Sequence, residues 1–489
     1  MPVLHIVTFF LALISTQAFA LPIDWNGAFG VDTNLINSYR RIEQKTDRSA
    51  VGGGGSQELP LATGEHQDSK FQTYVFRLQP VVLVNDAASV KAELTTGYGR
   101  GGRLGDSAIE TNESSQTAPT NSYGNILYPY TLSGNNALNV KQLYMELYSD
   151  TATYMIGRHT FQFGLGALVN SGSGLWDRHF SMRDGFTINL KLGNFHIAPY
   201  YSKSSSVGSL TGATDITEEG FTLVYDNPDR EMAFGLLYGG KNSSANESLT
   251  KTTISGSSAS LGAANVKMVD LYFQKSFGPL SFATEVPILS GDIGNIYGTD
   301  TKYKAKAILV ESWYKINSSW RFGFDGGRVS GEDSSQSSFE AMYLHPNYQI
   351  ANLLFKYNLR SVASPSTVSP FDSFVHNVNY YKFKTQYASE KWTWDLAVVL
   401  AQAAETAKAG SPAFNHTTNR SFTATQTQSD KLGTEVDVNF NYQWNNEVSI
   451  GGDVGYLFTG DYFAYTNDAA TTNTAKNSYL LQLKAGIKF

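Results

Sequence analysis

Apolar and polar residues alternate strictly in many stretches of this chain. In KLGTEVDVNFNYQ, residues 431–443, every second residue from Leu432 to Tyr442 is apolar, aromatic or threonine, and the residues between them are polar or glycine. The final stretch, SYLLQLKAGIKF at 478–489, has the same pattern. A period of two is typical of a β-strand with two different faces. Strands of about ten residues are long enough to cross a membrane when they are tilted.

The connections between the predicted strands alternate in length. Short ones, such as 193–194 and 444–446, alternate with long polar ones, such as 99–137 and 330–377. Tight periplasmic turns and long extracellular loops give outer-membrane barrels this asymmetry. We therefore predict an all-β fold, a transmembrane antiparallel up-and-down β-barrel of about 18 strands with both termini on the periplasmic side. A soluble β-sandwich, which also alternates, is the alternative. The predicted strands start near residues 26, 70, 88, 138, 152, 184, 195, 219, 231, 265, 279, 303, 319, 378, 391, 431, 447 and 478.

The first residues of the chain are typical of a secretory signal. Residues 4–20, LHIVTFFLALISTQAFA, form an apolar core that ends in a small-x-small tripeptide. We predict a signal peptide at 1–20 and a single barrel domain at 21–489; a short buried helix is the alternative for the first segment. No later run approaches the ~18 apolar residues that a membrane helix needs.

Composition excludes several classes of protein. The chain has 489 residues, a net charge of −6 and no cysteine, so a disulfide scaffold, a thiolate zinc site and a cysteine nucleophile are excluded. The acidic balance argues against a nucleic-acid partner. Aromatic residues make up 13% of the chain, and Trp25, Trp320, Trp392 and Trp444 fall near predicted strand ends. Amphipathic rings at those positions suit the headgroup layer of a membrane.

Candidate chemistry is sparse. His159 with Ser171 or Ser173 could form a base and a nucleophile, but no acidic or amide partner lies at a telling spacing. The histidines are scattered and show no metal-ligand spacing. We predict no catalytic, metal or cofactor site, and no enzyme. Solvated loop charge is preferred over a weak calcium site for the acidic loop residues Asp292, Asp300, Glu332 and Asp333.

Three stretches resemble known bacterial barrels. The terminal Phe489, behind alternating apolar residues, resembles the signal that the outer-membrane insertion machinery recognises. The stretch 144–186, with a Gly-Arg pair and then WDRHFSMRDGF, resembles alginate-export-type barrels, and so does 321–355, which begins RFGFDGGRVSGED. The resemblance implies an eighteen-stranded barrel that exports a polyanionic polysaccharide through a basic lumen.

The predicted inward faces depart from that basic lining, because their charges are mixed. Acidic residues gather in the last strands and basic residues in the earlier ones, and opposed walls of this kind favour polar or zwitterionic solutes. The alternative is that these are ordinary solvated lumen positions. The predicted pore-lining residues are Arg77, Lys91, Glu93, Glu146, Arg158, Arg178, Arg183, Glu285, Arg321, Asp325, Lys382, Asp395, Glu435, Asp437 and Asp453.

The long connection 330–377 is unusual, because its middle, 343–359, is apolar and aromatic. Apolar segments of this size usually find a partner surface. We predict that this loop folds into the mouth of the barrel and narrows the pore. The alternative is an extracellular hairpin that contacts a neighbouring subunit or lipopolysaccharide.

Two classes of function follow from these patterns. The first is a porin-like outer-membrane channel for polar or charged solutes, with polysaccharide export as a special case. The second is a non-conducting barrel that presents loops such as 106–136 and 411–430 for adhesion or structural roles. The expected partners are membrane lipid, lipopolysaccharide, the barrel-insertion machinery acting on Phe489, and the solute or polysaccharide.

Overall fold

The structure of the protein is a computed structural model. It describes residues 22–43, 68–97, 102–104, 138–206, 215–243, 250–252, 258–260, 263–334, 338–358, 369–417, 419–468 and 473–489. The predicted signal peptide at 1–20 and the candidate loop at 106–136 lie outside these residues. No helix among the described residues is long and apolar enough to cross a membrane.

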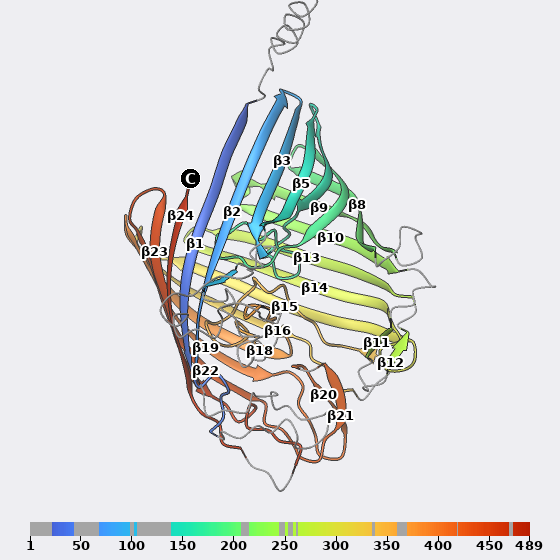
Figure 1. The fold of residues 1–489 in the computed structure, drawn as a ribbon, viewed down its shortest axis with the longest axis vertical. Helices are drawn as coiled ribbons and strands as arrows, with labels where there is room; N and C mark the ends of the chain where they lie inside the picture. The colour runs from blue at the N-terminus through green and yellow to red at the C-terminus, as the bar shows by residue number, and fades with distance from the viewer. Residues whose placement is uncertain are drawn as a thin grey trace, which may run out of the picture.

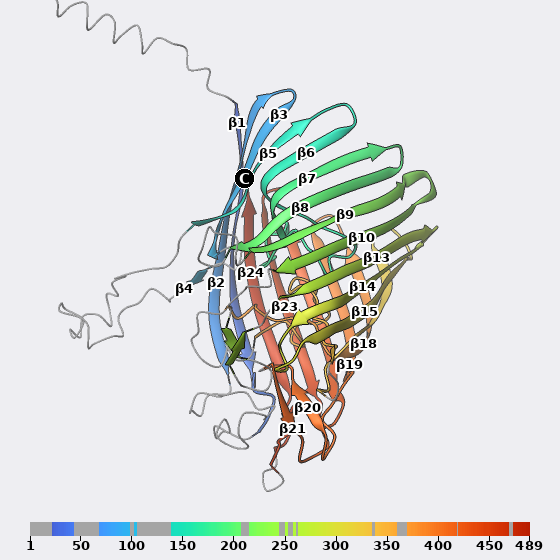
Figure 2. The ribbon, with the colours of Figure 1, turned by 90° about the vertical axis from the view of Figure 1, so that its right-hand side faces the viewer.

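Eighteen long antiparallel strands of the described residues form one closed ring (Figures 1 and 2). Each pairs with its sequence neighbour in the ring, and β1 also pairs with β24, with Ala28 opposite Lys488. The predicted fold class is therefore confirmed, and every predicted start lies within a few residues of an observed one. The ring strands are β1 (Ile23–Asn37), β2 (Ser69–Asn85), β3 (Ala88–Thr96), β5 (Leu138–Tyr148), β6 (Ala152–Thr160), β7 (Met182–Leu192), β8 (Phe195–Ser206), β9 (Asp215–Asn227), β10 (Met232–Ser243), β13 (Asn265–Phe277), β14 (Leu280–Gly294), β15 (Thr301–Lys315), β16 (Trp320–Val329), β18 (Val378–Ala388), β19 (Trp392–Ala403), β22 (Lys431–Gln443), β23 (Val448–Thr459) and β24 (Ser478–Lys488).

The two ends of the barrel differ. Figure 2 shows the tight turns at the same end as the C-terminus, and the hairpin of β20 (Pro412–Asn415) and β21 (Arg420–Thr423) at the other. We call these the turn end and the loop end. The other short strands are β4 (Gly102–Leu104), β17 (Ser338–Phe339), and the hairpin of β11 (Thr250–Thr252) with β12 (Ser258–Ser260).

The outer face of the barrel is apolar. On β18, Tyr381 and Phe383 point outward and are 56% and 55% exposed. Tyr380, which precedes Tyr381, points into the lumen and is 1% exposed. Leu481 and Leu483 on β24 are exposed in the same way. A continuous apolar belt around a closed barrel is the surface that a membrane barrel presents to lipid.

Aromatic rings form a girdle at the turn end. The rings of Trp320 and Tyr387 lie 5.0 Å apart, and those of Trp392 and Tyr442 lie 4.6 Å apart. Trp444, in the turn after β22, is 62% exposed. These positions match the headgroup level of one leaflet, where amphipathic rings are favoured.

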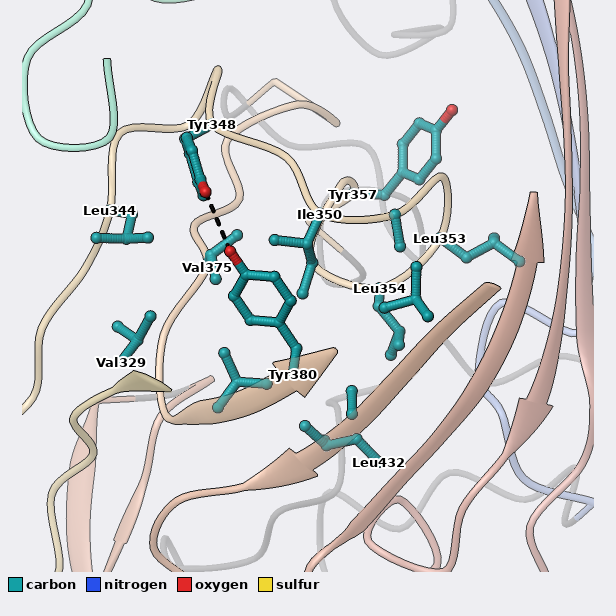
Figure 3. Packing of buried hydrophobic residues seen from close by; sticks show 14 of the residues in the cluster. Val329, Leu344, Tyr348, Ile350, Leu353, Leu354, Tyr357, Val375, Tyr380 and Leu432 are labelled. Atoms are coloured by element: carbon teal, nitrogen blue, oxygen red, sulfur yellow. Dashed lines mark hydrogen bonds between the residues drawn. The ribbon is translucent and has the colours of Figure 1, made fainter. Parts of the chain in front are cut away.

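The largest apolar core of the described residues lies inside the barrel. Residues of the β16–β18 connection, including Ile350, Leu353 and Leu354, are at most 2% exposed and pack against inward side chains such as Val399 and Leu432. Figure 3 shows this packing, with a hydrogen bond between the hydroxyl groups of Tyr348 and Tyr380. The segment 343–358 therefore lies in the lumen, because its apolar side chains are removed from water there.

Candidate functional site: two loops inside the barrel

Two connections enter the lumen and meet. We call residues 161–181, between β6 and β7, the first inward loop, and the described residues 338–358 and 369–377, between β16 and β18, the second inward loop. His345 N–H donates to the carbonyl of Ala167 at 2.7 Å. The side-chain amide of Asn347 donates to the carbonyl of His179 at 2.7 Å, and His179 Nε2 lies 2.6 Å from Asp372 Oδ1. The two loops thus form one partition across the lumen.

The first inward loop is fastened to the wall mainly by charged side chains. Glu285 on β14 accepts hydrogen bonds from the main-chain N–H groups of Leu165, at 2.5 Å, and Leu168, at 3.2 Å. Gly164 approaches this carboxylate with φ of +55°, and a Cβ there would lie 2.4 Å from Glu285 Oε2, so any other residue would be strained or displace the carboxylate. On the other side of the loop, Arg77 and Lys141 donate to the carbonyl of Gly172 at 2.9 and 2.8 Å.

The second inward loop is fastened by the same kind of carboxylate contact. Glu435 on β22 accepts from the main-chain N–H groups of Leu353, at 2.5 Å, and Leu354, at 2.8 Å. Arg41, just after β1, donates to the carbonyl of Leu353 at 3.0 Å. Hydrogen bonds with one charged partner are stronger than neutral ones, so these contacts fix the loop in one position.

Ion pairs cross from the inward loops to the wall. Arg178 of the first inward loop lies 2.5 Å from Asp32 on β1. Lys356 of the second inward loop lies 3.3 Å from Asp453 on β23, and Lys484 on β24 lies 2.9 Å from the same carboxylate. Burial acts to lower the pKa of Lys356, but its acidic and phenolic neighbours outweigh burial and raise that pKa, so the ammonium stays charged.

Two cavities lie along the barrel axis, one on each side of the partition. The turn-side cavity, of about 420 Å³, reaches Asp395 near the turn end of β19. The loop-side cavity, of about 530 Å³, reaches Leu432 near the loop end of β22. Lys356 lines the first and its neighbour Tyr357 lines the second, so the second inward loop separates them.

The linings of the two cavities differ in chemistry. Charged groups such as Asp32, Arg178 and Asp453 line the turn-side cavity. Aromatic rings such as Tyr343 and Phe463 line the loop-side cavity. The two sides of the partition therefore present different surfaces, aromatic on the loop side and paired charges on the turn side.

Three histidines of the loop-end region are kept neutral. Burial, helped by the charge of His179, lowers the pKa of His345 to about 4. Burial also lowers the pKa of His376 to about 4, and that of His416 falls well below its usual value. His416 Nε2 accepts a hydrogen bond from the main-chain N–H of Glu332 at 3.0 Å, which requires an unprotonated nitrogen.

Most of the predicted pore-lining residues face inward. On β18 and β19, for example, Lys382 and Asp395 alternate with exposed apolar neighbours, and Arg178 lies buried in the first inward loop. Several are neutralised locally: Arg77 lies 3.9 Å from Glu93, and Lys91 pairs with Glu146. Glu93 also lies 3.0 Å from Lys141, which was not among the predicted residues. That these side chains contact a solute in the pore remains a prediction. The inward residues on strands are Arg77, Lys91, Glu93, Glu146, Arg183, Glu285, Arg321, Asp325, Lys382, Asp395, Glu435, Asp437 and Asp453.

The prediction for Arg158 was wrong. On β6, Tyr154 and Ile156 point outward, and Arg158 follows them with the same alternation. Its guanidinium forms a double hydrogen bond with Asp184 on β7, at 2.7 and 2.8 Å. The pair neutralises both charges on the outer face, which is why an arginine is tolerated there.

The other candidate sites have simple structural roles. His159 Nε2 lies 2.9 Å from the hydroxyl of Thr187, and its other ring nitrogen faces the carbonyl of Gly157, so neither is bonded to Ser171 or Ser173. Asp292 on β14 pairs with Lys302 on β15. Within the described ranges, no group of three or more His, Cys, Asp or Glu side chains is arranged to hold a metal ion.

The alternation of short and long connections predicts 160–183 only as another long polar connection, so it does not predict the first inward loop. The stretch FQFGLGALV at 161–169 carried the signal, because it is mostly apolar yet follows directly after a strand. Lys141 and Lys356 were not among the predicted lumen residues, since ion-pair partners on distant elements leave no local pattern. Lys484 lies on the polar face of the alternating stretch 478–489 but was not named either.

Comparisons with known proteins give structural similarity only. The sequence matches no protein-family model and no curated protein. Among solved structures, OccK9 (OpdG) of Pseudomonas aeruginosa has 11% identity and a TM-score of 0.49, covering 95% of this chain and 99% of that one. OpdQ of the same species has 10% identity and a TM-score of 0.49, over 96% and 97% of the chains. OmpT of Vibrio cholerae, an outer membrane protein, has 8% identity and a TM-score of 0.38, over 97% and 99%. The fold of this protein rests on its own strand pairing.

Proposed function

We propose that this protein is an outer-membrane channel for small polar or charged solutes. The observation that supports it is the partition: two loops enter a closed barrel and leave a cavity lined by charged side chains on its turn side. Charges at the narrow part of a pore set its selectivity. Phe489 at the end of the last strand is the proposed signal for the barrel-insertion machinery.

Asp453 is the side chain on which ion selectivity should depend most. Its carboxylate balances both Lys356 and Lys484, so Asp453→Asn leaves two ammonium groups without their partner. We expect purified protein in planar bilayers to show stepwise conductance. We also expect Asp453→Asn to shift the reversal potential in a salt gradient toward anion preference.

The matched control is Asp461→Asn, a change of the same charge in the exposed loop after β23. It should leave the reversal potential unchanged. An absence of conductance in correctly folded protein would favour the alternative, a barrel that only presents its loops. Equal shifts of the reversal potential for the two variants would show that the partition does not set ion selectivity.

We also propose polysaccharide export as a special case of this channel function, based on the sequence resemblance. A polymer must pass between the two inward loops, so the contact between His179 and Asp372 would have to open. Addition of an oligouronate to the bilayer chamber tests this. Interruptions of the current that lengthen with chain length support export, and an unchanged current argues against it.

A further inference from the structure

The loop end of β15 has an unusual outer face. Lys302, Lys304 and Lys306 are exposed there, and they alternate with inward positions that include the buried Ala305. The next outward residue, Ile308, is 50% exposed and begins the apolar belt. Three ammonium groups therefore stand directly above the lipid-facing surface of one strand.

Residues of β16, next to β15, and of β13, two strands away, extend this feature. Lys267 on β13 lies opposite Ser290 on β14, which lies opposite Lys304, so the two lysines share a row about 10 Å wide. Arg328 on β16 lies opposite Ile308 and is exposed. We define the basic patch by its five residues, Lys267, Lys302, Lys304, Lys306 and Arg328.

Acidic residues offset the basic patch only at its edges. Asp292 pairs with Lys302, and Glu405 lies close enough to Arg328 for their charges to interact. Glu219 on β9 is two strands from Lys267 in the same row. Lys267, Lys304 and Lys306 form no ion pair with any carboxylate of the described ranges, so the centre of the patch is positive.

The position of the basic patch along the barrel determines which groups can neutralise its positive charge. A lysine on the lipid face costs several kcal/mol at the bilayer midplane and close to nothing at the interface, on the order of 0–1 kcal/mol. β15 has 15 residues, and about 10 suffice to cross the hydrocarbon, so the loop-end lysines stand at headgroup level. The turn end carries aromatic rings at the corresponding level, such as Tyr314 and Trp320. On the described part of β15, the cluster of positive charge therefore lies at the loop end.

We propose that the basic patch binds the phosphate groups of an anionic glycolipid in the leaflet at the loop end. Lysine binds phosphate as a point charge, and neighbouring lysines on one strand face can contact one phosphorylated headgroup together. Their alkyl stems lie along the apolar belt while the ammonium groups reach the headgroups. The proposal rests on the proposed outer-membrane location, where the loop end faces the phosphorylated glycolipid leaflet.

Native mass spectrometry of the full chain in detergent tests the proposal. The probes are a bisphosphorylated lipid A, the same glycolipid without phosphates, and phosphatidylethanolamine. We expect the phosphorylated glycolipid to bind at least about tenfold more tightly than the other two, since each basic residue near an anionic surface adds to binding. The double variant Lys304→Gln with Lys306→Gln should lose about tenfold in affinity for it.

Lys275→Gln is the matched control, because Lys275 lies on the outer face of β13 at the turn end. It should bind the phosphorylated glycolipid as the unchanged protein does. Arg328→Gln provides a second, single-site variant if the double variant is poorly folded. Equal binding of the glycolipid with and without phosphates would overturn the proposal, and so would equal losses for Lys275→Gln and the double variant.

Inorganic phosphate separates a lipid site from a free-anion site. Displacement of the glycolipid by phosphate at equal concentration would contradict a lipid-specific surface, and retention supports it. Channel conductance of the same variants is the independent measurement. Loss of glycolipid binding with unchanged conductance supports the patch, whereas absent conductance with intact binding refutes only the proposed channel function.

Discussion

The first and second inward loops occupy the same lumen, but different forces hold them there. The first has a small apolar cluster, in which Phe163 packs with Leu237, and it depends on Arg77, Lys141 and Glu285 for its main fastenings. The second contributes many fully buried apolar side chains to the largest core. Glu435 adds carboxylate contacts to that core but is not its only support.

The difference predicts how strongly each loop responds to a single substitution. Burial of apolar surface is non-directional and spread over many residues, so the loss of one contact leaves the rest in place. Charged hydrogen bonds are few, and removing one partner leaves a buried group unsatisfied. The first inward loop should therefore be sensitive to single substitutions, and the second should resist them.

Replacing residues 343–358 by a short glycine-serine linker should have the largest effect. The apolar segment that fills the lumen would be gone, so single-channel conductance should rise severalfold. Removal of 250–260, which contains the separate β11–β12 hairpin, is the control and should leave conductance unchanged. Unchanged conductance after removal of 343–358 would show that this segment does not limit the pore.

Glu285→Ala and Glu435→Ala compare the two fastenings directly. Each removes two charge-assisted hydrogen bonds to main-chain N–H groups, worth about 1.5–3 kcal/mol each. Hydrogen exchange should increase by tenfold or more across 163–168 in the first variant. In the second, the increase should be confined to 352–354, because the apolar core keeps the rest docked. A wider increase in hydrogen exchange in Glu435→Ala than in Glu285→Ala would contradict the proposed difference between the two loops.

Acid should loosen the second inward loop. The pKa of His345 is about 4 in the folded protein and about 6.5 when the loop is undocked, so between these values the undocked state binds the extra proton. Docking should weaken as pH falls from 7 to 4, by on the order of 2 kcal/mol for this histidine. Burial raises the pKa of Glu332, which has the opposite sign and offsets part of the loss.

Hydrogen exchange of 342–358 against pH measures this effect. Exchange should rise on acidification in the unchanged protein and rise less in His345→Asn, which cannot gain the proton. The first inward loop between 161 and 169 contains no histidine and serves as the internal reference. A flat profile for 342–358 would exclude histidine protonation as a cause of undocking.

Tyr348→Phe should have the smallest effect. It removes the hydrogen bond between the hydroxyl groups of Tyr348 and Tyr380, which lie 3.0 Å apart, but keeps the buried ring. We expect a loss of about 1 kcal/mol in docking free energy, with unchanged conductance. A large rise in conductance would show that this single contact, rather than the apolar core, holds the loop.

Alternation and loop length predicted the barrel because each strand carries its own period-two pattern. The prediction of an inward segment at 343–359 came from the same kind of local signal, a run of apolar residues. The partners of Asp453 on β24 and the second inward loop could not be predicted, since they depend on register and docking between distant segments. Arg158 was misplaced because a charged residue was assumed to face water, whereas Asp184 neutralises it on the outer face.

The central claim is that the two inward loops meet and form one partition in the membrane. The chain has no cysteine, so His179→Cys with Asp372→Cys introduces the only two thiols. A short bifunctional thiol reagent should join them rapidly in the membrane-inserted protein and leave single-channel conductance unchanged, because the loops are already in contact. Failure to form the cross-link, or a large fall in conductance once it forms, would contradict the account.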